Sequence, residues 1–167
     1  MFDEGHLFAW HIFTESRSLP GLTGHDWIAQ LGKPHPYTRA IQDIRDLADI
    51  MASIPENLRR CLANNVYEAG LLYLCLRNIA ISLSWHSQTG LDFSRFAPFH
   101  LAPPLLAIPL SLDRYRTYLG CRLATTRGLT PSQLDPESVR ADANLCLDWC
   151  VKNINMLQHN EKTEVLG

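Results

Sequence analysis

The sequence predicts an all-α protein: a four-helix bundle with a short N-terminal appendage and a proline-rich crossover between the second and third helices. Apolar residues recur at spacings of three and four over most of the chain, which is typical of amphipathic helices. No segment shows the alternation of apolar and polar residues that is typical of strands. Four prolines interrupt the helical pattern between residues 91 and 111, and such a long crossover suits a bundle whose two helical hairpins are joined across one end.

The first long helix is predicted from Tyr37, with an apolar stripe that passes through Ile44 and Met51. The segment Ser53-Ile54-Pro55-Glu56 has the spacing of a capping box, with proline early in the helix, where its missing N–H costs little. We therefore expect the first helix to end before Ser53 and a new helix to start there.

The second predicted helix, from Leu58 to Leu83, is apolar on much of its circumference. A helix of this kind belongs at the centre of a bundle. Asn64-Asn65 is expected to mark a kink or a break, and Gly90 is expected to end the segment.

The third helix is predicted from Leu112 to Leu123, with Gly128 as its stop. Thr130-Pro131 and Asp135-Pro136 each place a capping side chain before a proline at a first helical position. The last helix carries the cleanest apolar stripe, which consists of Val139, Ala143, Cys146, Cys150, Ile154 and Leu157.

Three parts are expected along the chain: an appendage over residues 1–32, the helical bundle over 33–160 and a frayed polar tail over 161–167. Within the appendage, Leu7 to Phe13 is predicted to be helical and Leu19-Pro20-Gly21 to form a turn. His25 to Leu31 is expected to make at most two helical turns.

The composition favours a globular protein with a buried core. The chain has 167 residues, of which 46% are hydrophobic and 19% charged, which excludes wholesale disorder and collagen-like or mucin-like chains. A formal net charge of −2 gives no global attraction to nucleic acid or to an acidic membrane. Whether the protein binds nucleic acid through a local site stays open. The N-terminus shows no secretion signal, and the apolar run at 101–110 is too short and too broken by prolines to span a bilayer. We expect a soluble, cytoplasmic protein.

The five cysteines are interpreted as reduced thiols that pack as small hydrophobic side chains. Cys146 and Cys150 share a helix face, but no histidine lies near them in sequence and the chain has no Cys-x2-Cys pair. We therefore predict no metal and no cofactor. The common phosphate-binding, hydrolase and metalloprotease motifs are also missing, so no residue is assigned a catalytic role.

Arg77 and Asn78 are polar residues in the middle of the apolar second helix. A buried guanidinium needs partners, because an unpaired buried charge costs several kcal/mol. Two interpretations stay open: a structural polar network, or a site that faces a ligand.

Five arginines between residues 93 and 127 form a local excess of positive charge, opposed within that stretch only by Asp113: Arg95, Arg114, Arg116, Arg122 and Arg127. Arginine suits phosphate groups. The alternative is a solvated helix whose charges are compensated by Glu137, Asp142 or Asp148 of the neighbouring helix. The candidate ligand-binding residues of the chain are Arg77, Asn78, His86 and Arg95.

Tyr73 to Ser84, which reads YLCLRNIAISLS, resembles the central helix of the helical domain attached to small bacterial nucleotidyltransferases. That domain belongs to, or is close to, the HEPN group of four-helix bundles. Phe93 to Phe99 resembles the connection that follows this helix, and Gly5 to Gly21 is similar to the end of the nucleotidyltransferase domain, a closing helix and then a short strand. The resemblance implies a HEPN-like bundle.

The chain departs from both activities of these families. It has no Gly-Ser motif followed by the paired aspartates that hold magnesium and the nucleotide in the transferases. HEPN ribonucleases use an arginine, often followed by asparagine, with a histidine four to six residues on. Arg77-Asn78 matches the first half, but serines stand at 82 and 84, and His86 comes too late. Arg95 and His100 have the spacing of the ribonuclease arginine and histidine, but Pro98 lies between them and the segment is predicted to be a loop.

Three hypotheses about function follow. The first is a non-catalytic helical module that binds a partner chain or a nucleotide-bearing ligand. The second is a HEPN-type, metal-independent ribonuclease of a toxin–antitoxin pair, and the third is a plain dimerisation scaffold. The expected partner is a second copy of the chain or a separate nucleotidyltransferase-type chain. The apolar run at 101–110 is expected to form an interface, unless it folds back over the end of the bundle.

Overall fold

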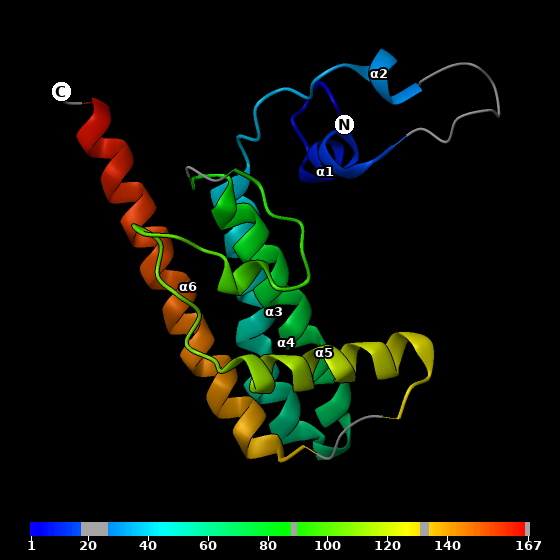
Figure 1. The fold of residues 1–167 in the computed structure, drawn as a ribbon. Coiled ribbons are helices and arrows are strands. Elements are labelled where there is room, and N and C mark those ends of the chain that lie inside the picture. The colour runs from blue at the N-terminus through cyan, green and yellow to red at the C-terminus, as the bar shows by residue number, and fades with distance from the viewer. Residues whose placement is uncertain (18–26, 88–89, 131–133, 166–167) are drawn as a thin grey trace. The chain divides into compact units, whose positions relative to one another are not determined.

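The computed structural model describes residues 1–17, 27–87, 90–130 and 134–165 (Figure 1). These residues form helices and no strand, which confirms the all-α prediction. The chain divides into two compact units, Met1–Ile41 and Gln42–Gly167. The expected division into an appendage, a bundle and a tail stays a prediction.

The first unit contains helices α1 (Leu7–Glu15) and α2 (Trp27–Leu31). The buried Trp10 donates from its indole nitrogen to the carbonyl of His35, at 2.9 Å. Gly5 has a φ of 62°, and a Cβ there would lie 2.1 Å from the Pro36 carbonyl oxygen, so only glycine fits this turn. The predicted helix over Leu7 to Phe13 is confirmed, whereas the predicted turn at 19–21 lies outside the described residues.

Helix α3 (Ala40–Arg60) continues through Pro55, so the prediction of a new helix at Ser53 is wrong. The Ser53 hydroxyl donates to the Ile50 carbonyl instead of capping a helix. A proline inside a helix costs about 3 kcal/mol. Ile54 and Leu58 are fully buried, and each contributes about 1.5–3 kcal/mol, so the apolar stripe outweighs the local signal.

The break between α3 and α4 occurs at a short 3-10 turn, Leu62–Asn64, and α4 runs over Asn65–Ser84. The expected break at Asn64-Asn65 is therefore confirmed. Helix α4 ends at Ser84, six residues before Gly90, so the prediction that Gly90 ends the helix is wrong. The buried Ser84 hydroxyl accepts from the Asp92 amide at 2.9 Å and ties the following connection to the end of the helix. Gly90 has a φ of 78° in the connection that follows.

The boundaries between α5 (Leu112–Arg127) and α6 (Pro136–Val165) follow the capping rules read from the sequence. Gly128 ends α5 in the left-handed conformation, and its amide donates to the Ala124 carbonyl. The Asp135 carboxylate accepts from the amides of Glu137 and Ser138 and caps α6. The other predicted cap, Thr130-Pro131, extends outside the described residues.

Helix α4 lies at the core of the second unit, and α5 starts beside α6 and crosses α4 rather than running along it (Figure 1). The crossing is close at Gly70, where a Cβ would stand 3.0 Å from the backbone N and Cα of Arg122. The stretch Leu62–Ser84 is long and apolar enough to cross a membrane. However, 67% of its most apolar 18-residue segment is buried inside the fold, as in the core helix of a soluble protein.

The proline-rich crossover, residues 91–111, is anchored along α6. The Leu106 amide donates to the side-chain oxygen of Asn153, and its carbonyl accepts from the Trp149 indole, both at 2.9 Å. Leu105 and Ile108 are buried, whereas Leu106 keeps 37% of its surface exposed. The apolar run therefore packs in part on the second unit itself, and its role as an interface stays a prediction.

The prediction that the cysteines pack as small hydrophobic side chains is confirmed for four of them, Cys75, Cys121, Cys146 and Cys150, and is wrong for Cys61, which is exposed. Burial raises the pKa of the Cys75 and Cys146 thiols to about 12. Within the described part of the chain, no group of three histidines, cysteines or acids stands together in a way that could hold a metal ion.

Candidate functional site

Arg77 fastens the crossover to α4. Its guanidinium donates to the Phe93 carbonyl at 2.5 Å and to the Ser94 carbonyl at 3.2 Å, and a longer contact of 3.4 Å reaches the Asn78 side chain. These bonds join residues sixteen and seventeen positions apart in sequence. The Arg77 guanidinium therefore fixes the backbone of Phe93 and Ser94, directly before Arg95 in the chain.

A second set of polar contacts organises the same turn around Asp92. One carboxylate oxygen accepts from the Ser94 amide at 2.8 Å, and the other pairs with Nδ1 of His100 at 2.6 Å. Burial alone would raise the pKa of Asp92, but the hydrogen bonds from Ser94 and His100 outweigh it and lower the pKa. Because Nδ1 faces Asp92, Nε2 is the nitrogen of His100 left for other partners on a ring that is 56% exposed.

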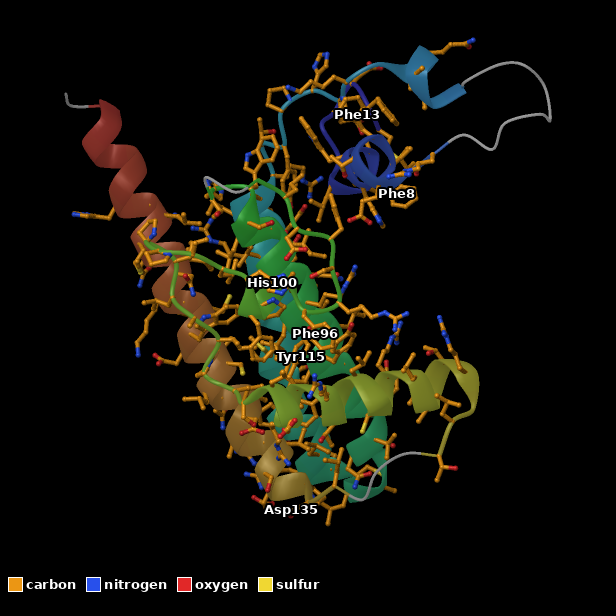
Figure 2. The ribbon with its side chains drawn as sticks, in the orientation of Figure 1. Phe8, Phe13, Phe96, His100, Tyr115 and Asp135 are labelled. Atoms are coloured by element: carbon orange, nitrogen blue, oxygen red, sulfur yellow. The ribbon has the colours of Figure 1, made fainter. Side chains whose placement is uncertain are left out.

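An aromatic cluster lies beside this turn. The buried Tyr115 ring has its centre 5.2 Å from those of Tyr73 and Phe99 and 6.2 Å from that of Phe96. Its hydroxyl donates to the Arg95 carbonyl at 3.0 Å. Figure 2 shows His100, Phe96 and Tyr115 in succession toward α5. The aromatic packing thus holds the backbone of Arg95 against α5.

Three arginines from different elements carry charges that act on Tyr73, and we refer to Arg77, Arg95 and Arg122 as the arginine cluster. Burial raises the pKa of Tyr73, while the positive charges of all three arginines lower it. Arg122 comes from α5 at the point where that helix touches Gly70 of α4. The Arg95 side chain is exposed and that of Arg122 half-buried, and neither guanidinium pairs with any residue of the described ranges.

Two other arginines of this stretch, Arg114 and Arg116, are compensated, in part as the sequence alternative expected, whereas Arg127 forms no ion pair with the described residues. Arg114 of α5 pairs with Asp142 of α6 at 2.6 Å, and the Tyr118 hydroxyl donates to the same carboxylate. Arg116 pairs with Asp113 one turn earlier at 3.3 Å. The two remaining acids considered as partners pair within α6 instead: Asp148 with Lys152 and Glu137 with Arg140.

The structure therefore brings three of the four candidate residues together: Arg77, Asn78 and Arg95. His86 lies in the turn after α4, nine residues beyond Arg77, which corresponds to about 13 Å along a helix. Two residues of the site were not among the candidates. Arg122 was only one of several arginines in a basic stretch of the sequence, and no local sequence pattern singled out Asp92.

A separate groove of about 360 Å³ lies between α3 and α6 in the second unit. Its walls combine small and apolar side chains with one cation and one acid. The residues that line it are Arg45, Ala48, Asp49, Ala52, Leu147, Val151, Ile154, Asn155 and Gln158.

Comparison of the chain with models of known protein families, with curated proteins and with solved structures gives no match.

Proposed function

We propose that this chain is a non-catalytic, cytoplasmic helical module, related to the HEPN-like accessory bundles of nucleotidyltransferases, that binds a nucleotide-bearing ligand or a partner chain. The observation that supports binding over catalysis is the position of Arg77. Its guanidinium is engaged by the Phe93 and Ser94 carbonyls and holds Arg95 in place. An arginine bound in this way is a positioning residue rather than a group that meets a reacting bond.

Incubation of the purified protein with RNA tests this proposal, with the Arg77→Ala variant alongside. We expect no cleavage by either protein. A neighbouring gene that encodes a chain with the Gly-Ser and paired-aspartate motifs would supply the partner to test by co-purification of the two tagged chains. RNA cleavage by the parent protein that Arg77→Ala abolishes would refute a non-catalytic role.

A HEPN-type ribonuclease is the second candidate, and one observation favours it. His100 and Arg95 are both exposed, five residues apart, and Asp92 orients the His100 ring through Nδ1. A carboxylate-oriented imidazole is suited to general acid–base chemistry. Under this alternative, RNA cleavage would be lost in both His100→Ala and Arg95→Ala and kept in His86→Ala.

The third candidate is a homodimeric scaffold, which the exposed Leu106 of the crossover supports. Light scattering at micromolar concentration distinguishes a dimer from a monomer of 18.9 kDa. If Leu106 lies at the interface, Leu106→Asp converts the dimer to the monomer. A monomer in both proteins would exclude the scaffold.

A further inference from the structure

Neither Arg95 nor Arg122 forms an ion pair with an acid of the described residues, and the same holds for Arg45, Arg77 and Arg127 of the second unit; of these five, only Arg77 and Arg122 are half-buried. Arg59, Arg60, Arg114, Arg116 and Arg140 all form ion pairs with acids of the described chain. Arg122 is half-buried at the crossing of α4 and α5, where a guanidinium loses part of its hydration without gaining a hydrogen bond from the described residues. A partly desolvated cation of this kind is stabilised by an anion that the chain does not supply.

The backbone segments that carry Arg95 and Arg122 pack on the same face of α4. On α4, Gly70, Tyr73 and Arg77 follow each other at helical spacings of three and four, so they share a face. Arg122 meets that face at Gly70, and the loop of Arg95 meets it through the bonds that Arg77 donates. Burial raises the pKa of Tyr73 on this face, and the positive charge of each of the three arginines lowers it.

We infer that the arginine cluster binds the phosphate groups of a nucleotide, with Arg95 and Arg122 as the phosphate ligands and Arg77 as the residue that positions Arg95. This inference rests on the proposed binding function and names its ligand and its site. Guanidinium groups bind phosphate oxygens through paired, charge-assisted hydrogen bonds. Two guanidinium groups without an ion-pair partner among the described residues fit a ligand with several phosphate groups better than they fit a ligand with a single carboxylate.

The rim of the site offers a surface for a base as well. Phe96, the neighbour of Arg95, is half-buried, and the Arg116 guanidinium lies 6.0 Å from its ring centre. Bases stack on aromatic rings and on guanidinium planes. A nucleotide thus fits the combination of an arginine pair and a half-exposed aromatic ring better than inorganic phosphate does.

Calorimetric titration of the full chain with ATP at low ionic strength tests the inference. We expect Arg95→Gln and Arg122→Gln each to weaken binding by about tenfold or more. Arg45→Gln is the matched control, since it removes the same charge from the α3 surface that lines the separate groove, and it should bind as the parent protein does. Thermal melts establish that each variant is folded, and Arg122→Lys, which keeps the charge, should recover part of the affinity.

Competition experiments separate the parts of the ligand. Inorganic tripolyphosphate should displace ATP and adenosine should not, because the arginines hold the phosphates. Equal affinity of Arg122→Gln and Arg45→Gln, binding of adenosine as tight as that of ATP, or no binding of ATP at millimolar concentration would each overturn the inference. Capture of the motif-bearing partner chain by a protein that binds no ATP would leave the proposed function standing while this inference fails.

Discussion

Glu68 is a buried acid in the first turn of α4, with 2% of its surface exposed. Burial raises the pKa of its carboxyl, against the lowering effect of a hydrogen bond from Asn57. One carboxyl oxygen has no hydrogen-bond partner among the described residues. The fold therefore favours the protonated form of this residue.

This placement predicts a pH dependence of stability. Because the pKa of Glu68 is raised in the folded state, the contribution of this residue to stability is fully present below the ordinary value of 4.5 and is lost as the pH rises through the folded-state pKa, since only the unfolded chain ionises freely in that window. Glu68→Gln should remove this fall, so that the variant gains stability relative to the parent protein between pH 5 and pH 8. Urea denaturation at both pH values measures the change, and parallel pH profiles of the two proteins would contradict it.

The thiols differ in reactivity for the same physical reason. Cys61 is exposed, whereas burial raises the pKa of the Cys75 and Cys146 thiols to about 12 and that of Cys150 to about 11. A thiol reagent at neutral pH should modify one cysteine in the native protein and all five in denaturant. Rapid modification of a second thiol in the native protein would argue against the packing of α4 on α6.

At the scale of elements, the close approach of α4 and α5 depends on Gly70. Gly70→Ala places a methyl group 3.0 Å from the backbone of Arg122, which cannot rotate away as a side chain would. We expect a loss of about 1–3 kcal/mol in the free energy of unfolding. Gly120→Ala is the control, because nothing lies within 4 Å of its Cβ position in α5, and it should stabilise by about 0.5–1 kcal/mol. Equal effects of the two substitutions in urea denaturation would show that the helices do not meet at Gly70.

The attachment of the crossover to α6 depends on Asn153, which is fully buried and accepts from the Leu106 amide. Asn153→Ala leaves that amide without its partner and should destabilise the protein by about 1–3 kcal/mol. Hydrogen exchange at the Leu106 amide should quicken in the variant. The exposed Asn155 serves as the control, and Asn155→Ala should leave this exchange rate unchanged.

Helix boundaries show where local signals decide the structure and where they do not. Gly128 and Asp135 act within one turn of the residues that they cap, so the sequence predicts the end of α5 and the start of α6. The capping signal at Ser53 fails because Ile54 and Leu58 bury fully on the continuing helix. Burial is a property of the packed molecule and overrides a local preference of similar size.

At the scale of the whole molecule, the described chain consists of helices joined by irregular segments. The far-ultraviolet circular dichroism spectrum should therefore be dominated by helix and lose its signal on heating. A spectrum dominated by strand would contradict the fold.

The sequence by itself determined the helical class, the stripe of α6 and the break before α4, because each follows from spacings within a few residues. It also singled out Arg77 as a polar residue that needs partners, without naming them. Only the tertiary structure decided that the partners are the carbonyls of Phe93 and Ser94 and that Arg122, forty-five positions further on, faces the same part of α4. The reason is that such contacts join segments that the chain brings together only when helices cross, and the crossing is set by the packing of whole helix faces rather than by any local pattern.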